Sequence, residues 1–243
     1  MTNDLQILTC DTSTIPTAAV SELLLLLSSE ERERFDWFGF SEDRRDFAAS
    51  HALLRVALSA KTNLAPERFR FGATPWGKPF LISSRGRDPA PSFSLAHARG
   101  LVACAIGDGP LGIDVEVIDP AVDALHLAER FFSTAETAAL RECSADVRAG
   151  RFCELWTLKE SLGKALGFGL GVSMRHPSFT IEADGVHTDG ARGWSFYVED
   201  VGGRYKLAVA ARDGGVIQRR LVDAGGLAEG RMLDGFGALP LLQ

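Results

Sequence analysis

The chain has 243 residues, of which 46% are hydrophobic and 24% are charged, and its formal net charge is −6. These values are ordinary for a folded globular protein and exclude a largely disordered chain. The net negative charge argues against nucleic acid as a partner. The length is sufficient for one large domain or for two small lobes that share a core.

Features of the amino terminus, the apolar runs and the cysteines bear on where the protein acts. The segment MTNDLQILTC lacks the basic region of a signal peptide. The longest apolar run, Leu23 to Leu27, is too short to span a bilayer. The four cysteines form no CxxC pair and have no histidine at metal-binding spacing, which argues against a disulfide framework or a zinc site. We therefore expect a soluble, cytoplasmic protein that does not act on membranes.

The first half of the chain predicts two helices followed by strands. Ser28 and Glu31 have the spacing of a capping box and predict the start of a short charged helix. Ser41 is the expected N-cap of a longer helix that ends near Ala60. Several strand-like runs follow this helix, at residues 68–71, 79–82, 92–95 and 101–106.

The second half repeats this order. A strand is predicted over residues 111–118, and Ser133 and Glu136 form a second capping box that starts a short helix. The longest predicted helix spans Val147 to Leu166 and is closed by Gly167. Further strands are predicted at residues 177–181, 194–199 and 205–212.

Because a long helix followed by several strands occurs twice, we expect an α+β fold of two similar lobes. The expected N-terminal lobe covers residues 1–109, and the C-terminal lobe, with the metal site described next, covers residues 110–220. Residues 221–243 contain five glycines and are expected to form a loose tail.

Two acidic residues of the predicted strand 111–118 are candidate metal ligands. Strand side chains alternate between faces, so Asp114 and Glu116 point the same way. Neighbouring carboxylates repel each other, and a bound hard cation would remove that repulsion. A solvated edge strand, on which charges prevent aggregation, explains the pair equally well.

The longest predicted helix offers a third carboxylate. Trp156, Glu160 and Lys164 are four residues apart and share one helical face. Glu160 can complete a metal site with the two strand carboxylates, and Lys164 can meet a phosphate bound to that metal. The spacing taken alone favours the alternative, which is an ordinary Glu–Lys surface pair beside a packed tryptophan.

Two basic residues lie at turns. His97 ends a predicted strand and is followed by Arg99, so it is a candidate phosphate ligand, although such a histidine is more often a core or turn residue. Lys78 is held at the rigid turn Gly77-Lys-Pro79, where exposed lysines are common.

In combination, these motifs resemble the 4′-phosphopantetheinyl transferases of the Sfp type. In chain order the motifs are Gly77-Lys-Pro79, Leu95-Ala-His97, Gly112-Ile-Asp-Val-Glu116 and Trp156-Thr-Leu-Lys-Glu-Ser161. The linking stretch 128–136 is also similar to that family. The resemblance extends from Ser41 to Tyr205, which is most of the chain.

The resemblance implies a fold in which two similar lobes are related by a pseudo-twofold axis and hold coenzyme A in the cleft between them. It implies transfer of the 4′-phosphopantetheine group of coenzyme A to a serine of an apo acyl or peptidyl carrier protein, with release of adenosine 3′,5′-bisphosphate. Carriers of fatty acid, polyketide and nonribosomal peptide synthesis all remain open. Since the two lobes can form the whole site, a monomer is expected.

The resemblance also assigns roles to the residues of the main motifs. Asp114, Glu116 and Glu160 are expected to hold Mg²⁺, with Mn²⁺ as a possible substitute. Glu160 is the expected base, acting directly or through a metal-bound water, and Lys164 is expected to meet the pyrophosphate.

Further residues are expected to hold the donor. Lys78 and His97 match phosphate contacts of the family, and Arg44 and Arg45 are the candidates for holding the nucleotide. Ala96 stands where the family often has a serine, which removes one hydroxyl contact to the 3′-phosphate.

Two other functions remain as alternatives. A magnesium-dependent phosphotransferase or nucleotidyl enzyme is opposed by the absence of Walker, HRD and DFG motifs. A non-catalytic carrier-binding module is opposed by the presence of all three carboxylates and both lysines. For the transferase function, the segment 123–151 is the expected docking surface for an acidic carrier. Its basic residues are Arg130, Arg141, Arg148 and Arg151.

Overall fold

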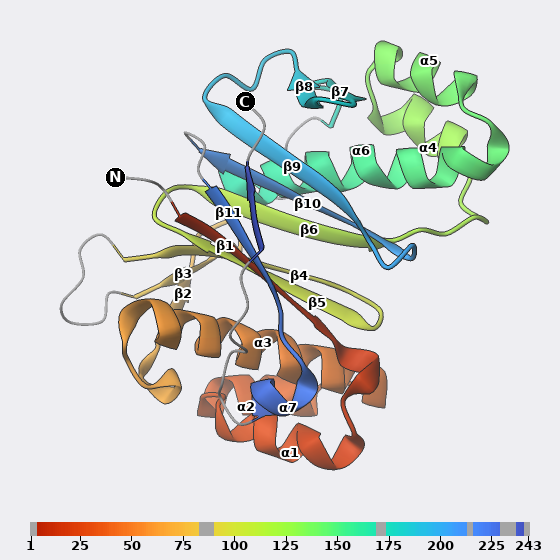
Figure 1. The fold of residues 1–243 in the computed structure, drawn as a ribbon. Helices are drawn as coiled ribbons and strands as arrows, with labels where there is room; N and C mark the ends of the chain where they lie inside the picture. The colour runs from red at the N-terminus through yellow and green to blue at the C-terminus, as the bar shows by residue number, and fades with distance from the viewer. Residues whose placement is uncertain (1–3, 83–89, 169–173, 213–215, 229–236, 241–243) are drawn as a thin grey trace.

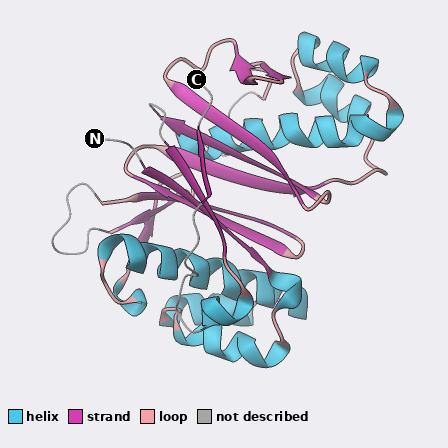
Figure 2. Ribbon diagram, in the orientation of Figure 1, coloured by secondary structure: helices cyan, strands magenta, loops and turns pink. Residues whose placement is uncertain are grey.

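The two long helices lie on opposite outer faces of the molecule, with the strands between them (Figure 1 and Figure 2). Helix α3 spans Ser41–Thr62 and helix α6 spans Ala145–Leu166. The expected α+β class is confirmed. The structure is a computed structural model, and it describes residues 4–82, 90–168, 174–212, 216–228 and 237–240.

Local sequence explains how these helices begin and end. Helix α6 stops at Gly167, which adopts a left-handed φ of 81° as the predicted C-cap. Helix α3 stops in the same way at Asn63, with a φ of 57°. Ser41 is the first residue of α3 and not its N-cap, because the capping position is taken by Phe40, which makes no side-chain capping bond.

The larger sheet, called here the N-terminal sheet, has the strand order β12-β11-β1-β5-β4. Strand β1 pairs with β5 antiparallel and with β11 parallel. Its strands are β1 (Asp4–Asp11), β4 (Ser92–Ala98), β5 (Leu101–Gly107), β11 (Val216–Leu221) and β12 (Gly237–Pro240).

The second sheet, called here the C-terminal sheet, is antiparallel and has the order β6-β10-β9. Its edge strand β6 meets the edge strand β4 of the other sheet, where the backbone N–H of Ile113 donates to Ser94 Oγ at 3.2 Å. The strands are β6 (Leu111–Val117), β9 (Trp194–Val201) and β10 (Tyr205–Arg212). Two hairpins complete the described strands: β2 (Phe71–Ala73) with β3 (Pro79–Leu81), and β7 (Phe179–Glu182) with β8 (Gly185–Thr188).

Shorter elements flank each long helix (Figure 1). On the α3 side these are α1 (Thr17–Leu25), α2 (Ser29–Asp36), α7 (Ala224–Ala228) and the 3₁₀ turns Thr12–Thr14 and Pro66–Arg68. On the α6 side they are α4 (Ala124–Phe131) and α5 (Thr134–Glu142). Within the described residues, no helix has both the length and the hydrophobicity that crossing a membrane requires.

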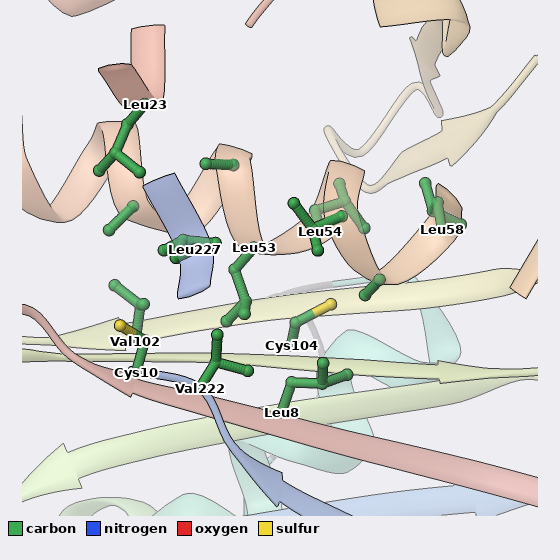
Figure 3. Packing of buried hydrophobic residues seen from close by; sticks show 14 of the residues in the cluster. Leu8, Cys10, Leu23, Leu53, Leu54, Leu58, Val102, Cys104, Val222 and Leu227 are labelled. Atoms are coloured by element: carbon green, nitrogen blue, oxygen red, sulfur yellow. The ribbon is translucent and has the colours of Figure 1, made fainter. Parts of the chain in front are cut away.

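Buried side chains form three layers that hold this arrangement together. The first lies between α3 and the N-terminal sheet, where Leu53 of α3 packs with Leu8 and Val102 of the strands (Figure 3). The second lies between the sheets and the third between the C-terminal sheet and α6. Burial of these apolar surfaces is the main stabilising contribution. The molecule is therefore a four-layer stack of helix, sheet, sheet and helix.

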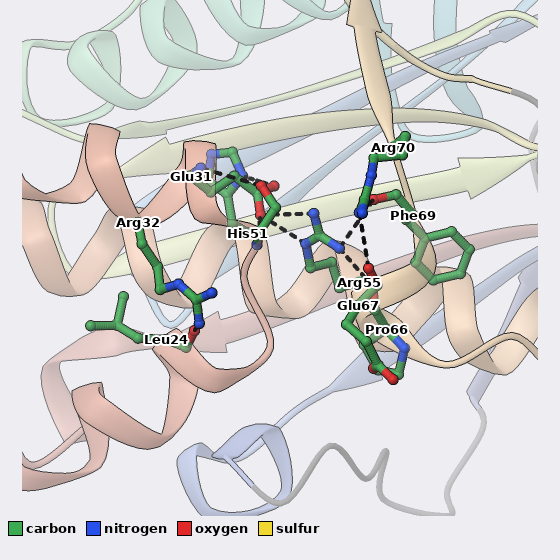
Figure 4. Close-up of polar contacts among 10 residues, drawn as sticks. Leu24, Glu31, Arg32, His51, Arg55, Pro66, Glu67, Phe69 and Arg70 are labelled. Carbon is green, nitrogen blue, oxygen red and sulfur yellow. Dashed lines mark hydrogen bonds and ion pairs between the residues drawn. The ribbon is translucent and has the colours of Figure 1, made fainter.

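A capping box ties α2 to α3. Ser28 N donates to Glu31 Oε2 at 2.8 Å and Glu31 N donates to Ser28 Oγ at 3.3 Å, as the sequence predicted. The same carboxylate lies 2.9 Å from Nε of the buried Arg55 and 3.0 Å from Nδ1 of His51 (Figure 4). Arg55 also donates to the carbonyl oxygen of Pro66 at 2.6 Å.

The same arrangement recurs around α6. Ser133 and Glu136 close the second predicted capping box, with distances of 2.8 and 3.2 Å. Glu136 Oε1 lies 2.9 Å from Nζ of the buried Lys159, which also donates to the carbonyl oxygen of Pro177 at 2.9 Å. In each half of the chain, a capping glutamate thus binds a buried cation of the long helix, which in turn reaches a proline carbonyl.

The C-terminal residues lie differently from the predicted lobe boundaries. Residues 216–220, expected in the C-terminal lobe of 110–220, pair with β1 in the N-terminal sheet. In the expected loose tail 221–243, Val222 and Leu227 are buried and α7 contacts α1 and α3, because these residues cover an apolar face of the first core layer. Residues 229–236 and 241–243 of that tail lie outside the described residues. The boundary near residue 109 stays a prediction.

Candidate functional site

The candidate site lies where α6 crosses strand β6, and a glycine permits the crossing. A Cβ atom on Gly112 would lie 2.0 Å from the carbonyl oxygen of Ser161 and 2.4 Å from the backbone N of Ala165. These are backbone atoms of α6, so no larger residue fits without displacing the helix. The close approach brings the end of α6 onto the next residues of β6.

Strand alternation places the acidic residues on the α6 face of β6, as the sequence predicted. Ile113 and Val115 point into the layer between the sheets. Asp114 lies under α6 with only 5% of its surface exposed, and Lys164 Nζ is 2.7 Å from its Oδ1. Lys164 also reaches the carbonyl oxygen of Leu95 on β4, at 3.5 Å. The site therefore includes both sheets at the point where their edges meet.

Three carboxylates in the site have raised pKa values. Burial raises the pKa of Asp114 even though Lys164 opposes the effect. Burial, followed by the charge of Asp114, raises the pKa of Glu116 from 4.5 to about 7. Burial and the charge of Asp114 also raise the pKa of Glu160. The carboxylates are thus close enough to disfavour one another's charge, and a cation would relieve this repulsion.

One oxygen of Asp114 further supports a cation site. Oδ2 is buried and has no hydrogen-bond partner among the residues that the structure describes, whereas Oδ1 pairs with Lys164. Burying an unpartnered carboxylate oxygen is unfavourable, so a ligand there would be stabilising. Hard cations such as Mg²⁺ take carboxylate oxygens. The residues Asp114, Glu116 and Glu160 therefore fit a hard divalent cation.

The oxygens of these carboxylates do not yet form a closed ligand set. Among the described residues, the group whose ligand atoms all lie within 4.8 Å of one another is elsewhere, on the exposed β7–β8 hairpin, and comprises Glu182, Asp184 and His187. Three-point coordination at the candidate site would thus require side-chain rotation, for which half-buried Glu116 and Glu160 have room.

Trp156 interacts with Glu116, which the residue spacing within the predicted helix did not indicate. A hydrogen bond to Trp156 lowers the pKa of Glu116, although burial and Asp114 outweigh it. The indole ring also packs at 5.7 Å from each of Phe131 and Phe152. A cavity of about 220 Å³ opens beside this pair. Its lining is mostly apolar: Glu116, Val117, Asp119, Val122, Leu127, Ala149, Phe152, Cys153 and Trp156.

Lys78 lies beside the site but is engaged by the protein. Its Nζ donates to the carbonyl oxygens of Ala165 at 2.9 Å and Leu111 at 3.1 Å, and burial lowers its pKa. The lysine thus fastens the β2–β3 turn to the end of α6. The phosphate contact implied by the resemblance stays a prediction, and it would require Lys78 to leave these carbonyls.

His97 is exposed at the end of β4, and its charge lowers the pKa of Asp114, so it lies near the carboxylates. It lines an open cavity of about 490 Å³ together with Phe40, Glu42, Asp43, Asp46, Ala98 and Arg99. Arg99 is paired with Glu42. The acidic neighbours were not expected for a phosphate contact. They come from the first two turns of α3, which the strand pattern around His97 does not reveal.

The two candidate nucleotide-binding arginines differ from each other. Arg44 Nε donates to the carbonyl oxygen of Phe38 at 2.8 Å, and its guanidinium lies over the ring of Phe35 at 5.6 Å. Arg44 is therefore bound to its own segment. Arg45 differs in that its buried Nε has no hydrogen-bond partner in the described part of the chain. Neither arginine is among the residues that line the cavity of His97.

Most of the arginines on the predicted docking surface, residues 123–151, are engaged by other groups of the protein. Arg148 donates to the carbonyl oxygens of Leu140 at 3.0 Å and Cys143 at 2.7 Å, so it caps the end of α5. Arg141 and Arg151 each pair with a glutamate. Charge reversal at Arg148 would therefore damage the fold, and Arg148 cannot serve as a simple test of electrostatic steering.

Comparisons with known proteins point to one family. Residues 110–210 match the model of the 4′-phosphopantetheinyl transferase superfamily, and residues 16–107 match that of the 4′-phosphopantetheinyl transferase N-terminal region. A 4′-phosphopantetheinyl transferase of Bacillus subtilis is 30% identical over 193 residues, which is 78% of this chain and 84% of the relative. The transferase Sfp of Bacillus subtilis strain 168 is 31% identical over 65% of this chain and 68% of its own length.

Further matches are more distant or shorter. The transferase HetI of Nostoc sp. is 34% identical over 64% of this chain and 65% of the relative. Among solved structures, a holo-(acyl-carrier-protein) synthase from Bacillus anthracis in complex with CoA (3′,5′-ADP) is 16% identical and has a TM-score of 0.37. It covers 42% of this chain and 94% of its own, and this score is too low to support a structural argument.

Proposed function

The chain belongs to the 4′-phosphopantetheinyl transferase superfamily, and from this we propose that it transfers 4′-phosphopantetheine from coenzyme A to a serine of an apo acyl or peptidyl carrier protein. The observation that carries the proposal is the ion pair of the buried Asp114 with the partly exposed Lys164 at the β6–α6 crossing. Glu116 and Glu160 lie within electrostatic reach of this pair. These groups suit a pyrophosphate and its counter-ion.

The reaction exchanges a phosphoanhydride bond for a phosphate ester bond at the β-phosphorus. The serine oxygen forms a bond to this phosphorus, and the bond to the bridging oxygen breaks, so that adenosine 3′,5′-bisphosphate leaves with the electron pair. Glu160 is the proposed acceptor of the hydroxyl proton, and its raised pKa favours that role. Lys164 supports the negative charge of the leaving group.

A divalent cation is the proposed partner of these residues. Asp114, Glu116 and Glu160 would hold Mg²⁺, or Mn²⁺ in its place, and the cation would neutralise charge on the pyrophosphate. The orphaned Oδ2 of Asp114 is the atom that most directly supports this assignment. Deprotonation of Glu116 would accompany binding, because a coordinating carboxylate is ionised.

The cavity beside Trp156 is the proposed place for the pantetheine arm. Its mostly apolar lining suits a neutral chain, and Glu116 at its mouth connects it to the phosphate site. We also propose that the protein works as a cytoplasmic monomer, since β4, β6 and α6 of one chain supply His97, the three carboxylates and Lys164. Light scattering at assay concentration tests the oligomeric state.

Intact mass spectrometry tests the transfer. The protein is incubated with coenzyme A, Mg²⁺ and a panel of apo carriers from fatty acid, polyketide and nonribosomal peptide synthesis. We expect a gain of one phosphopantetheine on a single serine, and no gain in excess chelator or when that serine is replaced by alanine. A gain of phosphate alone would favour a phosphotransferase. Normal binding of coenzyme A and Mg²⁺ without modification of any carrier would favour a non-catalytic binding module.

A further inference from the structure

A buried lysine next to the proposed base makes no contact with the site. Lys159 precedes Glu160 in α6, but its side chain is only 3% exposed and points toward α5 and β7. Its Nζ lies 2.9 Å from Glu136 Oε1 and 2.9 Å from the carbonyl oxygen of Pro177. The ammonium also lies over two aromatic rings, those of Phe132 at 5.4 Å and Phe179 at 5.3 Å.

The carboxylate of Glu136 binds residues of three elements. Glu136 Oε2 accepts from Ser133 N at 2.8 Å, which starts α5, and Glu136 Oε1 accepts from Phe179 N at 2.8 Å, which starts β7. Lys159 adds α6 to the same carboxylate. Glu136 is 1% exposed, and its carboxylate is held by α5, β7 and α6 together. The ammonium of Lys159 is therefore fixed in one position.

A buried ion pair is weak evidence for stability, since apolar residues of similar size often stabilise as well or better. A better-attested role of a buried ion pair is to favour one packing arrangement of the elements over the others. In α6 the arrangement to be selected is the rotation of the helix about its own axis. Successive residues are about 100° apart around a helix, so fixing Lys159 fixes the direction of Glu160 and that of Lys164.

We propose that Lys159 is a positioning residue, whose buried pair with Glu136 sets the rotation of α6 so that Glu160 and Lys164 face Asp114 and Glu116. The inference rests on the proposed function, because it gives a role to the cation site of that function. It adds a residue whose side chain touches none of the reacting groups.

The chain supplies a matched control. Arg55 of α3 pairs with the capping glutamate Glu31 and is equally buried, at 1% exposure. It too reaches a proline carbonyl and lies over an aromatic ring, that of Phe71. None of the three carboxylates or Lys164 lies on α3. Loss of either pair should therefore affect stability, but only loss of the pair on α6 should affect the site.

The test compares the double variants Lys159→Met/Glu136→Gln and Arg55→Met/Glu31→Gln, each of which removes a whole ion pair without leaving a buried charge unpaired. Thermal unfolding gives stability, and electron paramagnetic resonance gives the affinity for Mn²⁺ without coenzyme A or carrier. We expect the two double variants to shift stability by similar amounts. Only the α6 variant should bind Mn²⁺ about tenfold or more weakly, with a matching fall in kcat, as is typical for residues behind a metal ligand.

Three results would overturn the inference. The first is Mn²⁺ affinity and kcat within about twofold of wild type for the α6 double variant. The second is an equal loss of Mn²⁺ affinity in the α3 double variant, which would mean general loosening of the fold. The third is a wild-type protein that binds no Mn²⁺. If the α6 double variant does not fold, Lys159→Arg is judged by the same criteria, because it keeps the charge but changes the geometry.

Failure of the inference and failure of the proposed function are separable. The Mn²⁺ titration needs no substrate, so it reports on positioning even if no carrier protein is modified. A wild-type protein that transfers phosphopantetheine, with an α6 double variant that binds Mn²⁺ normally, would retain the function and reject the role of Lys159.

Discussion

The environment of the Asp114 side chain suits the proposed cation site but is unfavourable for the stability of the metal-free protein. Asp114 Oδ1 is paired with Lys164, while its buried Oδ2 has no hydrogen-bond partner among the described residues, and burial raises its pKa. Such an environment is unfavourable for a carboxylate whose second oxygen has no partner. The metal-free protein is therefore expected to be less stable than the same fold with fewer charges in the site.

Glu116→Gln tests this balance at one residue. Burial and Asp114 hold the pKa of Glu116 at about 7, so a neutral glutamine resembles the protonated form that the metal-free site favours. We expect this variant to lose transfer activity and to bind Mn²⁺ at least tenfold more weakly. Its Tm in chelator at pH 8 should equal or exceed that of wild type. A large fall in Tm with normal Mn²⁺ binding would instead mean that Glu116 is structural.

Much of the site is predictable from residue spacing, because the relevant periodicities are local. Strand alternation placed Asp114 and Glu116 on one face, and helical spacing placed Glu160 and Lys164 together. The carbonyl partners of Lys78 could not be predicted, because they belong to segments far away in the chain. The acidic neighbours of His97 could not be predicted for the same reason.

At the scale of elements, the crossing of β6 and α6 determines whether the site can form. Gly112→Ala would place a methyl group against backbone atoms of Ser161 and Ala165, which cannot move independently of the helix. We expect a loss of more than about 2 kcal/mol in the free energy of unfolding, measured in urea, together with loss of activity.

Gly150→Ala is the control for this substitution. Gly150 lies in the same helix, but its nearest neighbour beyond the helix backbone is Lys206 Cε at 3.8 Å, an ordinary contact. Alanine there should leave stability unchanged or raise it by up to about 1 kcal/mol through its better helix propensity. Equal effects of the two substitutions would refute the close-approach explanation for Gly112.

The capping box of α2 makes stability depend on pH. Burial would raise the pKa of Glu31, but the hydrogen bond and charge of His51, the N–H of Ser28 and the charge of Arg55 outweigh it and lower the pKa from 4.5 to about 2. This corresponds to stabilisation on the order of 3 kcal/mol. Because the pKa is lowered on folding, the stabilisation is present above pH 4.5 and is lost as the pH falls toward 2.

Glu31→Gln should therefore lower Tm strongly at pH 6, and the difference from wild type should shrink steadily as the pH falls from about 4.5 to 3. Thermal unfolding followed by circular dichroism over this range measures it. Glu33→Gln, on the exposed side of the same helix, is the control and should change Tm little at any pH. A difference between Glu31→Gln and wild type that does not vary with pH would contradict the assignment.

Elements with local signals were the ones that the sequence predicted. Both capping boxes, the two long helices and the Gly167 cap are confirmed, because each depends on residues within one or two turns. Strand β11, with the sequence VIQRRL, lacks clear alternation and pairs with β1 at the other end of the chain. A pairing over that separation leaves no local pattern, so its sheet could not be assigned.

The two halves of the chain share one local arrangement, and they pack together as one molecule. The capping glutamates and buried cations recur in both halves. The layer between the sheets joins them, as do the contact of Ile113 with Ser94 and the return of β11 to the N-terminal sheet. The site lies on this junction, so it depends on the packing of both halves.

Two leucines in the expected loose tail distinguish a loose segment from a packed one. Leu227 of α7 is fully buried in the core layer beneath α3, beside Leu23 and Leu53 (Figure 3). Leu221, six positions earlier, is 68% exposed. A loose tail predicts that neither side chain matters, whereas the packed arrangement predicts very different consequences for the two.

We expect Leu227→Ala to lower the free energy of unfolding by about 2 to 4 kcal/mol, because it removes buried methyl groups and leaves a cavity. Leu221→Ala should change it by less than about 0.5 kcal/mol. Urea denaturation of the full chain measures both, with an unchanged m-value showing that the unfolded state is the same. A matching fall in transfer activity near the melting temperature would show that α7 supports the site through the fold, since α7 contacts α1 and α3 and supplies none of the site residues. If both substitutions have equal and negligible effects, residues 221–228 are part of a loose tail, as the composition predicted.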